Sequence, residues 1–247
     1  MQPPSPLLPF GQDIDFDESL GSDPSNDATS TESAVHIAVP RVERPSRRAA
    51  DPLAVNARLL AVATEHLRRF GPDRVTVIAI AAEMGRSHGG VYRYFPSRDA
   101  LLDAVAGHWL RDVEAELARI SDAPDPAYDK IEHLLTALAN FQRDALAHEP
   151  NLFAVHLNAT AAGRPVARRH RVRLRSLVER VVEKGIAAGT FRTRDRERAI
   201  AYNFDASYRF THPLPIQQDA DLPRDLVDAR LGAVILAIQK VLQAGTF

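Results

Sequence analysis

The sequence has no cysteine, one tryptophan and two methionines among its 247 residues. The absence of cysteine excludes a disulfide framework, a thiolate metal site and a cysteine nucleophile. No apolar run approaches the roughly 20 residues that a membrane-spanning helix needs. The first residues also lack a basic flank followed by an apolar stretch, which is the pattern of a secretory signal. We therefore expect a cytoplasmic protein without a membrane anchor.

The net charge of −1 conceals segments of opposite charge. Residues 1–39 hold seven acidic residues and no lysine or arginine, whereas residues 40–98 hold eleven arginines against five acidic residues. Residues 1–50 are rich in Pro, Ser, Asp and Thr and show no sustained periodicity. Such a segment buries too little apolar area to offset the entropy of ordering. We expect a disordered acidic tail here, followed by a basic arm that includes Arg47 and Arg48.

From Leu53 onward, apolar residues recur at spacings of three and four, which is the period of an amphipathic helix. The first helix ends at Gly71-Pro72, a short second one starts after Thr76 and ends at Gly85, and a third runs from Ser87 to Tyr94. Ser97 caps a long fourth helix. Further helices are expected over 127–148, 151–162, 165–188, 195–211 and 223–244. No segment alternates with period two, so we predict an all-α fold: a small three-helix unit followed by a larger helical bundle.

The short second and third helices, over residues 76–95, have the layout of a helix-turn-helix. Two helices that cross steeply need a small residue where they touch, here Ala81, and a glycine where the chain reverses, here Gly85. The second of the two then enters the major groove of DNA by its N-terminal residues. Hydroxyls at the helix starts, on Thr76, Ser87 and Ser97, suit contacts with phosphate.

Residues 54–105 resemble the DNA-binding part of the TetR family of transcriptional regulators. The resemblance rests on Phe70-Gly71, Thr76-Val77, Ile80-Ala81, Gly85, Ser87, Gly89, Tyr92-Arg-Tyr-Phe95, Pro96-Ser97-Arg98-Asp99 and Leu101-Leu102. It implies that residues 51–98 form the DNA-binding domain and residues 99–247 a domain for effector binding and dimerisation. A plain helical hairpin inside a bundle is the alternative interpretation.

The resemblance also assigns roles to single residues. Tyr92 and Tyr94 would contact the DNA backbone, and Thr76 and Arg98 would hold phosphates. Three residues would face base edges: Arg86, His88 and Gly90. We add Ser87, Arg47 and Arg48 to the DNA-binding set, and we assign Phe95 to the core.

Three of these positions depart from the family pattern. Arg86 stands where a small apolar residue is common, and it could bind a guanine in two places or grip a phosphate. His88 replaces a basic or small residue, so its contact could depend on protonation. Gly90 leaves the reading helix without a side chain and weakens it by about 1 kcal/mol relative to Ala. The operator sequence therefore does not follow from the family.

Regulators of this family carry an effector pocket in the larger domain, with apolar walls and a few polar groups. Polar and aromatic residues at plausible inward positions are Trp109, Phe141, Phe153, His156, Asn158, Tyr202, Asp205, Tyr208 and Arg209. Core packing or surface exposure stays open for each of them. Asp205 and His212 are two candidate metal ligands without a third, so we predict neither a metal site nor a cofactor, and a turn-forming role for His212.

The last helix carries an apolar stripe that is too wide for one partner. With the helix at 195–211 it could form a symmetric four-helix interface, as in the family. The residues expected there are Tyr208, Leu226, Leu231, Val234, Ile238 and Val241. Packing within one subunit is the alternative.

Two charged segments have open interpretations. Residues 164–175 hold six arginines, which could attract nucleic acid, lie on a solvated helix face or pair with the acidic tail. The tail itself could compete with DNA for the basic segment or be inert.

Together these patterns predict a homodimeric regulator, a repressor by family analogy, that binds a pseudo-palindromic operator and is released by a small-molecule effector. A helical adaptor that binds protein is the main alternative. A helical enzyme is a further one, although the sequence has no nucleophile elbow, phosphate loop or metal-ligand spacing.

Overall fold

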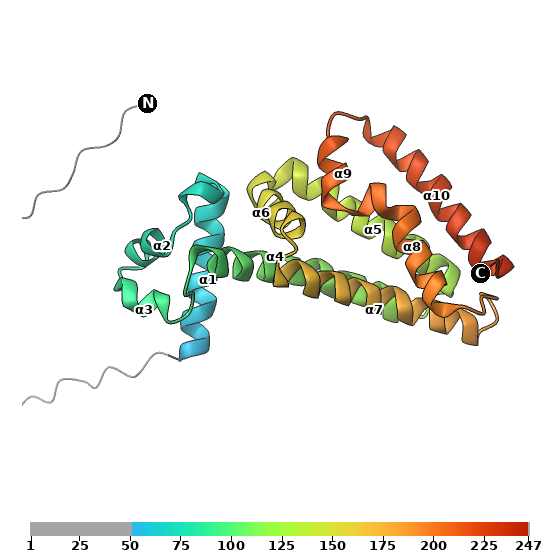
Figure 1. Cartoon of the computed structure of the whole chain (residues 1–247), viewed down its shortest axis with the longest axis horizontal. Coiled ribbons are helices and arrows are strands. Elements are labelled where there is room, and N and C mark those ends of the chain that lie inside the picture. The colour runs from blue at the N-terminus through green and yellow to red at the C-terminus, as the bar shows by residue number, and fades with distance from the viewer. Residues whose placement is uncertain (1–50, 247) are drawn as a thin grey trace, which may run out of the picture. The chain divides into compact units, whose positions relative to one another are not determined.

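The computed structural model describes residues 51–246, which form ten α-helices, one 3₁₀ turn and no strand (Figure 1). The elements are α1 (Pro52–Phe70), η1 (Pro72–Arg74), α2 (Val77–Glu83), α3 (His88–Tyr92), α4 (Arg98–Asp122), α5 (Ala127–His148), α6 (Pro150–Ala161), α7 (Pro165–Ala187), α8 (Arg196–Thr211), α9 (Pro213–Gln218) and α10 (Arg224–Ala244). This confirms the all-α prediction. The acidic tail and the basic arm with Arg47 and Arg48 lie outside the described residues. None of the described helices is long and apolar enough to cross a membrane.

The ends of the expected helices agree with the sequence signals to within two residues, and the structure adds one helix that was not expected. The third helix ends at Tyr92 rather than Tyr94, and its preceding Ser87 makes no capping hydrogen bond through its side chain. The segment after α8 was expected to be a break because of its prolines, yet it forms α9. Proline suits the first turn of a helix, where an N–H has no partner in any case. His212 Nδ1 accepts a hydrogen bond from Leu214 N (3.3 Å) and caps this helix, as its expected turn-forming role requires.

The helices α1, α2 and α3 and the start of α4 surround a common core, which we call the head. Leu59, Leu67, Ile80 and Val91 are completely buried in it. The first turns of α4 contribute Leu101, Leu102 and Val105, and the same core takes in Leu152, Val155 and Ala159 from α6. A domain boundary at residue 98 stays a prediction, since the helix that starts there packs into the head.

The remaining helices share a larger core. α4 and α7 lie side by side along much of their length, and α5, α8 and α10 complete this bundle (Figure 1). Gly185 on α7 permits a close approach, because a Cβ there would lie 2.1 Å from the ring of Phe191. The loop after α7 can therefore fold back and bury Phe191 in the core.

The arginine-rich segment lies on α7, where half of its six arginines pair with acidic residues of neighbouring elements. Arg164 contacts Asp99 (3.3 Å) and Asp103 (2.9 Å) at the start of α4. Arg173 pairs with Glu114 on α4 (2.6 Å). Arg175 pairs with Glu197 on α8. These pairs hold α7 against α4 and α8, so this part of the segment has a structural role.

Candidate functional site

The turn between α2 and α3 has the geometry of a helix-turn-helix. Thr76 Oγ accepts a hydrogen bond from Ala79 N (3.0 Å) and starts α2. Gly85 adopts a positive φ of 61°, and Arg86 N donates to Ala81 O (2.9 Å), so the chain reverses directly after α2. A left-handed backbone at this point is readily adopted by glycine. Buried Ile80, Ala81 and Val91 hold the two helices together.

The predicted DNA-contact residues of this unit lie mainly on its exposed side. Arg86, Ser87, His88 and Tyr92 are exposed. Thr76, Gly90, Tyr94 and Arg98 are half-buried, whereas Phe95 is buried in the head core as expected. The DNA contacts themselves stay predictions.

Arg98 has bonds inside the protein that the sequence did not reveal. Its Nε donates to Val75 O (3.0 Å) and its Nη2 to Pro72 O (2.7 Å). The guanidinium thereby ties the start of α4 to the turn that precedes α2. A phosphate contact from Arg98 stays a prediction, but its loss would also act through the fold of the head.

His66 is a further connecting residue in the head that the sequence did not point to. Its ring nitrogens contact Glu83 on α2 (Nδ1 to Oε2, 2.8 Å) and Arg74 O in η1 (Nε2, 3.2 Å). Both contacts depend on a chain reversal that brings α2 back along α1, so no local pattern could have predicted them.

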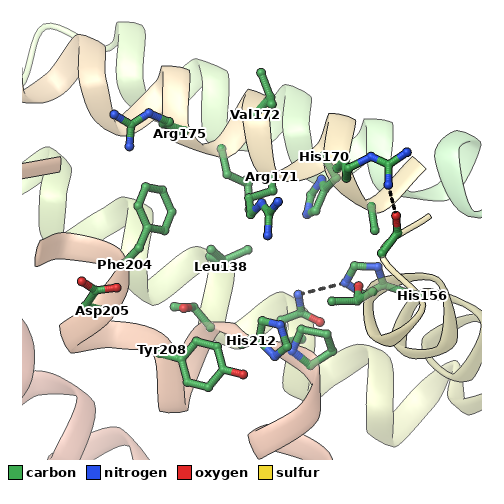
Figure 2. Close-up of a pocket in the computed structure, with 18 of the residues that line it drawn as sticks. Leu138, His156, His170, Arg171, Val172, Arg175, Phe204, Asp205, Tyr208 and His212 are labelled. Carbon is green, nitrogen blue, oxygen red and sulfur yellow. Dashed lines mark hydrogen bonds between the residues drawn. The ribbon is translucent and has the colours of Figure 1, made fainter. Parts of the chain in front are cut away.

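A second candidate site is a cavity of about 740 Å³ between α5, α6, α7, α8 and the start of α9 (Figure 2). This volume lies in the usual range for small-molecule pockets. Its polar lining includes Gln142, His156, Thr160, Arg168, His170, Arg171, Arg175, Asp205, Tyr208, Thr211 and His212. Its apolar lining includes Leu138, Val172, Leu174 and Phe204.

Three of the predicted pocket residues, His156, Asp205 and Tyr208, line this cavity. The others lie outside its lining. Trp109 and Phe141 pack against each other in the bundle (ring centroids 4.8 Å apart), and Phe153 is only 1% exposed in a small core of its own. Asn158, Tyr202 and Arg209 also lie outside the lining. Helical period alone does not say which of several inward positions faces a cavity.

The cavity residues that the sequence analysis missed come chiefly from α7. Arg168, Arg171 and Arg175 recur at spacings of three and four, so they share one helix face. That periodicity was available in the sequence, but a run of arginines is more often a solvated surface.

His156 is the most deeply buried titratable group of this site. The residue is only 3% exposed, and its Nε2 lies 3.4 Å from the amide nitrogen of Gln142. Burial lowers the pKa of His156 to about 3, and the nearby charges of His170 and His212 act in the same direction. His156 is therefore neutral at physiological pH.

His170 belongs to a polar network behind the cavity. Its Nδ1 lies 2.7 Å from Glu114 Oε1, and Arg173 Nη1 donates to the other carboxylate oxygen (2.6 Å). Burial by itself would raise the pKa of Glu114, but the hydrogen bonds and charges of His170 and Arg173 lower it below its ordinary value. The network fixes the His170 ring against α4. Among the described residues, no group of three or more histidine or carboxylate side chains is arranged to hold a metal ion.

Two family models match the chain. Residues 59–105 match "Bacterial regulatory proteins, tetR family", and residues 127–235 match "Tetracyclin repressor-like, C-terminal domain". The first match covers the helix-turn-helix and the second covers all the residues that line the cavity. The chain belongs to the TetR family of bacterial regulators.

Solved structures share this TetR fold. A protein of unknown function from Rhodococcus sp. RHA1 is 25% identical, with 81% of this chain and 100% of that chain covered (TM-score 0.58). A TetR/AcrR-family regulator from Thermobifida fusca is 21% identical over 78% and 99% of the two chains (TM-score 0.52). FadR from Bacillus subtilis, solved in complex with stearoyl-CoA, is 17% identical over 77% and 99% (TM-score 0.54). No curated protein matches the sequence.

The predicted TetR-type dimer residues divide into three groups by their exposure. Leu231 and Ile238 are 2% and 0% exposed, so their prediction as interface residues is wrong. They face the core of their own subunit. Val234 and Val241 are half-buried. Leu226 and Tyr208 are exposed, and so is Leu236 (45%), which the sequence analysis did not select. The apolar stripe was too wide because one side of it packs within the subunit.

Replacing Arg98 by alanine should destabilise the head. The variant loses two hydrogen bonds from a charged donor to backbone carbonyls, so we expect the free energy of unfolding to fall by about 1–2 kcal/mol. Arg93→Ala removes an exposed arginine from the same unit and should leave the value unchanged. Urea unfolding of both variants measures the free energy of unfolding. Equal stability of the two would contradict a stabilising role for the Arg98 hydrogen bonds.

The burial of His156 should make stability depend on pH. Between pH values of about 3 and 6.5 the unfolded chain binds a proton at this position and the folded protein does not, so acidification favours unfolding. The free energy of unfolding should fall below about pH 6.5, by up to about 1.4 kcal/mol per pH unit from this group.

Urea unfolding at several pH values, compared between the wild type and His156→Gln, isolates this contribution. The variant should have a shallower pH dependence. His133→Gln replaces an exposed histidine on α5 and should keep the wild-type slope. A wild-type slope in His156→Gln would show that the residue does not resist protonation.

Proposed function

We propose that this TetR-family regulator is a homodimeric repressor that binds a pseudo-palindromic operator and is released by a small-molecule effector. The observation that carries the proposal is the combination, in one chain, of an exposed helix-turn-helix and a cavity in the bundle beside it. The proposal makes the protein a regulator and not an enzyme. It would act in the cytoplasm, where bacterial DNA lies.

The exposed residues at the start of α3 support operator reading. Arg86, Ser87 and His88 stand at the end of the unit that enters the major groove in helix-turn-helix proteins. An arginine there can hydrogen-bond both acceptors of a guanine, which discriminates bases by about 1–3 kcal/mol. Tyr92, exposed near the end of the same helix, would contact the DNA backbone and add affinity without sequence preference.

Helix α6 offers a physical route from the cavity to the head. It contributes His156 and Thr160 to the cavity lining. At its start, Glu149 pairs with Arg68 on α1 (Nη2 to Oε2, 3.1 Å), and Asn151 Nδ2 donates to Arg68 O (3.0 Å). A ligand that displaces α6 would shift α1 and with it the reading helix. Coupling of this kind is typically worth 1–3 kcal/mol.

A dimer is needed because one short reading helix binds weakly, whereas two related by a two-fold axis read both halves of a pseudo-palindrome. The exposed side of α10 supports an interface: Leu226, Ala229, Ala233, Leu236 and Ala237 recur at helical spacing. Tyr208 on α8 is 48% exposed. The complex of FadR with stearoyl-CoA supports the other half of the proposal, because a regulator of this fold binds a small molecule.

Selection of bound sequences from a random DNA duplex library tests operator binding. The wild type should enrich a pseudo-palindrome. Arg86→Ala should relax the preference at one position of each half-site and cost about tenfold to a hundredfold in affinity for the best site. Tyr92→Phe should weaken binding to all sequences about equally, because it removes only a backbone contact.

Arg93→Ala is the control, since it removes a positive charge from the other end of α3 without removing a proposed base contact. Repeating the selection at two salt concentrations separates specific from purely electrostatic binding. If no sequence is enriched, and binding disappears at physiological salt, operator recognition is refuted and a protein-binding role gains weight.

Leu236→Glu should convert the dimer to a monomer, because it places a charge in the centre of the proposed apolar interface. Sedimentation velocity gives the oligomeric state, and operator affinity should fall in parallel. Leu53→Glu makes the same change at another exposed leucine, on α1, and should leave the dimer intact. A wild-type monomer, or a dimeric Leu236→Glu variant, would contradict this interface.

A further inference from the structure

The lining of the cavity carries more positive than negative charge. Arg168, Arg171 and Arg175 face it from α7, whereas Asp205 is its one acidic residue among those described. Figure 2 shows Asp205 beside Phe204, at the opposite side of the cavity from His156. The charge balance favours an anionic occupant over a neutral or cationic one.

Arg171 is the arginine of the three that is available to a ligand. Arg168 donates to Gly163 O, and Arg175 pairs with Glu197. For Arg171 the structure records no hydrogen bond or ion pair within residues 51–246. Figure 2 shows its guanidinium extending from α7 toward the side of the cavity that carries Tyr208 and His212. A guanidinium in this position can bind an acid group through two hydrogen bonds.

His212 provides a second donor opposite Arg171. Its Nδ1 accepts the hydrogen bond from Leu214 N, so in the neutral ring the proton is on Nε2. The Tyr208 ring stacks on the imidazole, with centroids 4.5 Å apart and planes at 27°, and holds its orientation. Burial, and then the charge of Arg171, lower the pKa of His212. The two side chains are thus close enough to interact, and an acid group between them would accept a hydrogen bond from each.

The inner part of the cavity holds polar atoms that have no partner. Four buried atoms belong to this set: Gln142 Oε1, His156 Nδ1, Thr160 Oγ1 and His170 Nε2. All four residues line the same cavity. Because His156 Nε2 faces the amide nitrogen of Gln142, its proton is on Nδ1, which is a free donor. Unpaired buried groups are costly, so a polar group of a ligand would stabilise them.

Another part of the cavity wall is apolar. Leu138 on α5, Leu174 on α7 and Phe204 on α8 line the cavity. Figure 2 shows Phe204 and His156 on opposite sides of Arg171 and His212, with Leu138 on the side of Phe204. An occupant must therefore combine an acid group with an apolar body.

We propose that the effector is an amphipathic organic acid, whose anionic group binds between Arg171 and His212 and whose apolar body lies against Leu138, Leu174 and Phe204. A further polar atom next to the acid group would pair with His156. This inference rests on the proposed function, since it names the ligand class of the proposed effector site.

The test uses a pair of fluorescent probes that differ in one acid group: anilinonaphthalene sulfonate and the uncharged phenylnaphthylamine. Titration of the full-length protein with each probe gives two dissociation constants. The wild type should bind the sulfonate more tightly. Arg171→Gln should weaken sulfonate binding at least about tenfold and leave binding of the uncharged probe unchanged, since it removes a charged donor but no apolar wall.

Arg169→Gln is the matched control, because it removes the same charge two residues earlier on α7, from a side chain outside the cavity lining. Both probes should bind it as they bind the wild type. Decanoate should displace the sulfonate from the wild type, and decanol should not at the same concentration.

Equal affinity of the wild type for the two probes would overturn the proposal, as would unchanged sulfonate binding by Arg171→Gln or an equal loss in Arg169→Gln. None of these measurements involves DNA. If they fail while an operator is still selected, the ligand class is wrong and the regulator function stands. If they succeed and no operator is selected, the ligand class stands and operator binding is refuted.

Discussion

The packing of α6 against both the core of the head and the cavity is the constraint that the rest of this structure depends on. One side of α6 places Leu152 and Val155 in the core of the head, and another places His156 and Thr160 at the cavity. Interiors are close-packed and do not deform continuously, so α6 cannot change position without disturbing one of the two. The contacts of Glu149 and Asn151 with Arg68 add polar bonds to the same connection.

The cavity is formed at a cost in stability. His156 and Gln142 are buried with polar atoms unpaired, and a folded chain gains nothing from that arrangement by itself. By contrast, the neighbouring His170 is bonded through Nδ1 to Glu114, which Arg173 also holds. In preorganised binding sites, a polar side chain is typically held by hydrogen bonds within the protein on one side and has an unpaired atom on the side of the cavity. His170 has both features, since its Nδ1 is bonded to Glu114 and its Nε2 has no partner. This is the physical reason to regard the cavity as a site.

The local signals in the sequence predicted the helices well, because capping and chain reversal depend on a few adjacent residues. Thr76, Gly85 and Ser97 act where they were expected to act. Signals that depend on distant neighbours failed. The apolar stripe of α10 did not show that Leu231 and Ile238 face their own subunit, and the composition around His66 did not show that α2 returns to it. Which side of a helix is buried depends on partners far away in the sequence.

The arginine-rich helix α7 shows the same limit most clearly, because its residues have different roles on different faces. Arg164, Arg168, Arg171 and Arg175 recur every three or four residues, which places them on one face, and Arg169 and Arg173 lie on another. Pairing with Asp99, Asp103, Glu114 and Glu197 accounts for half of the six. Charge counting treats all of them alike, as a surface for nucleic acid or a solvated face. Only the position of each side chain separates the arginines that hold helices together from Arg171, whose charge faces a cavity with no carboxylate bonded to it.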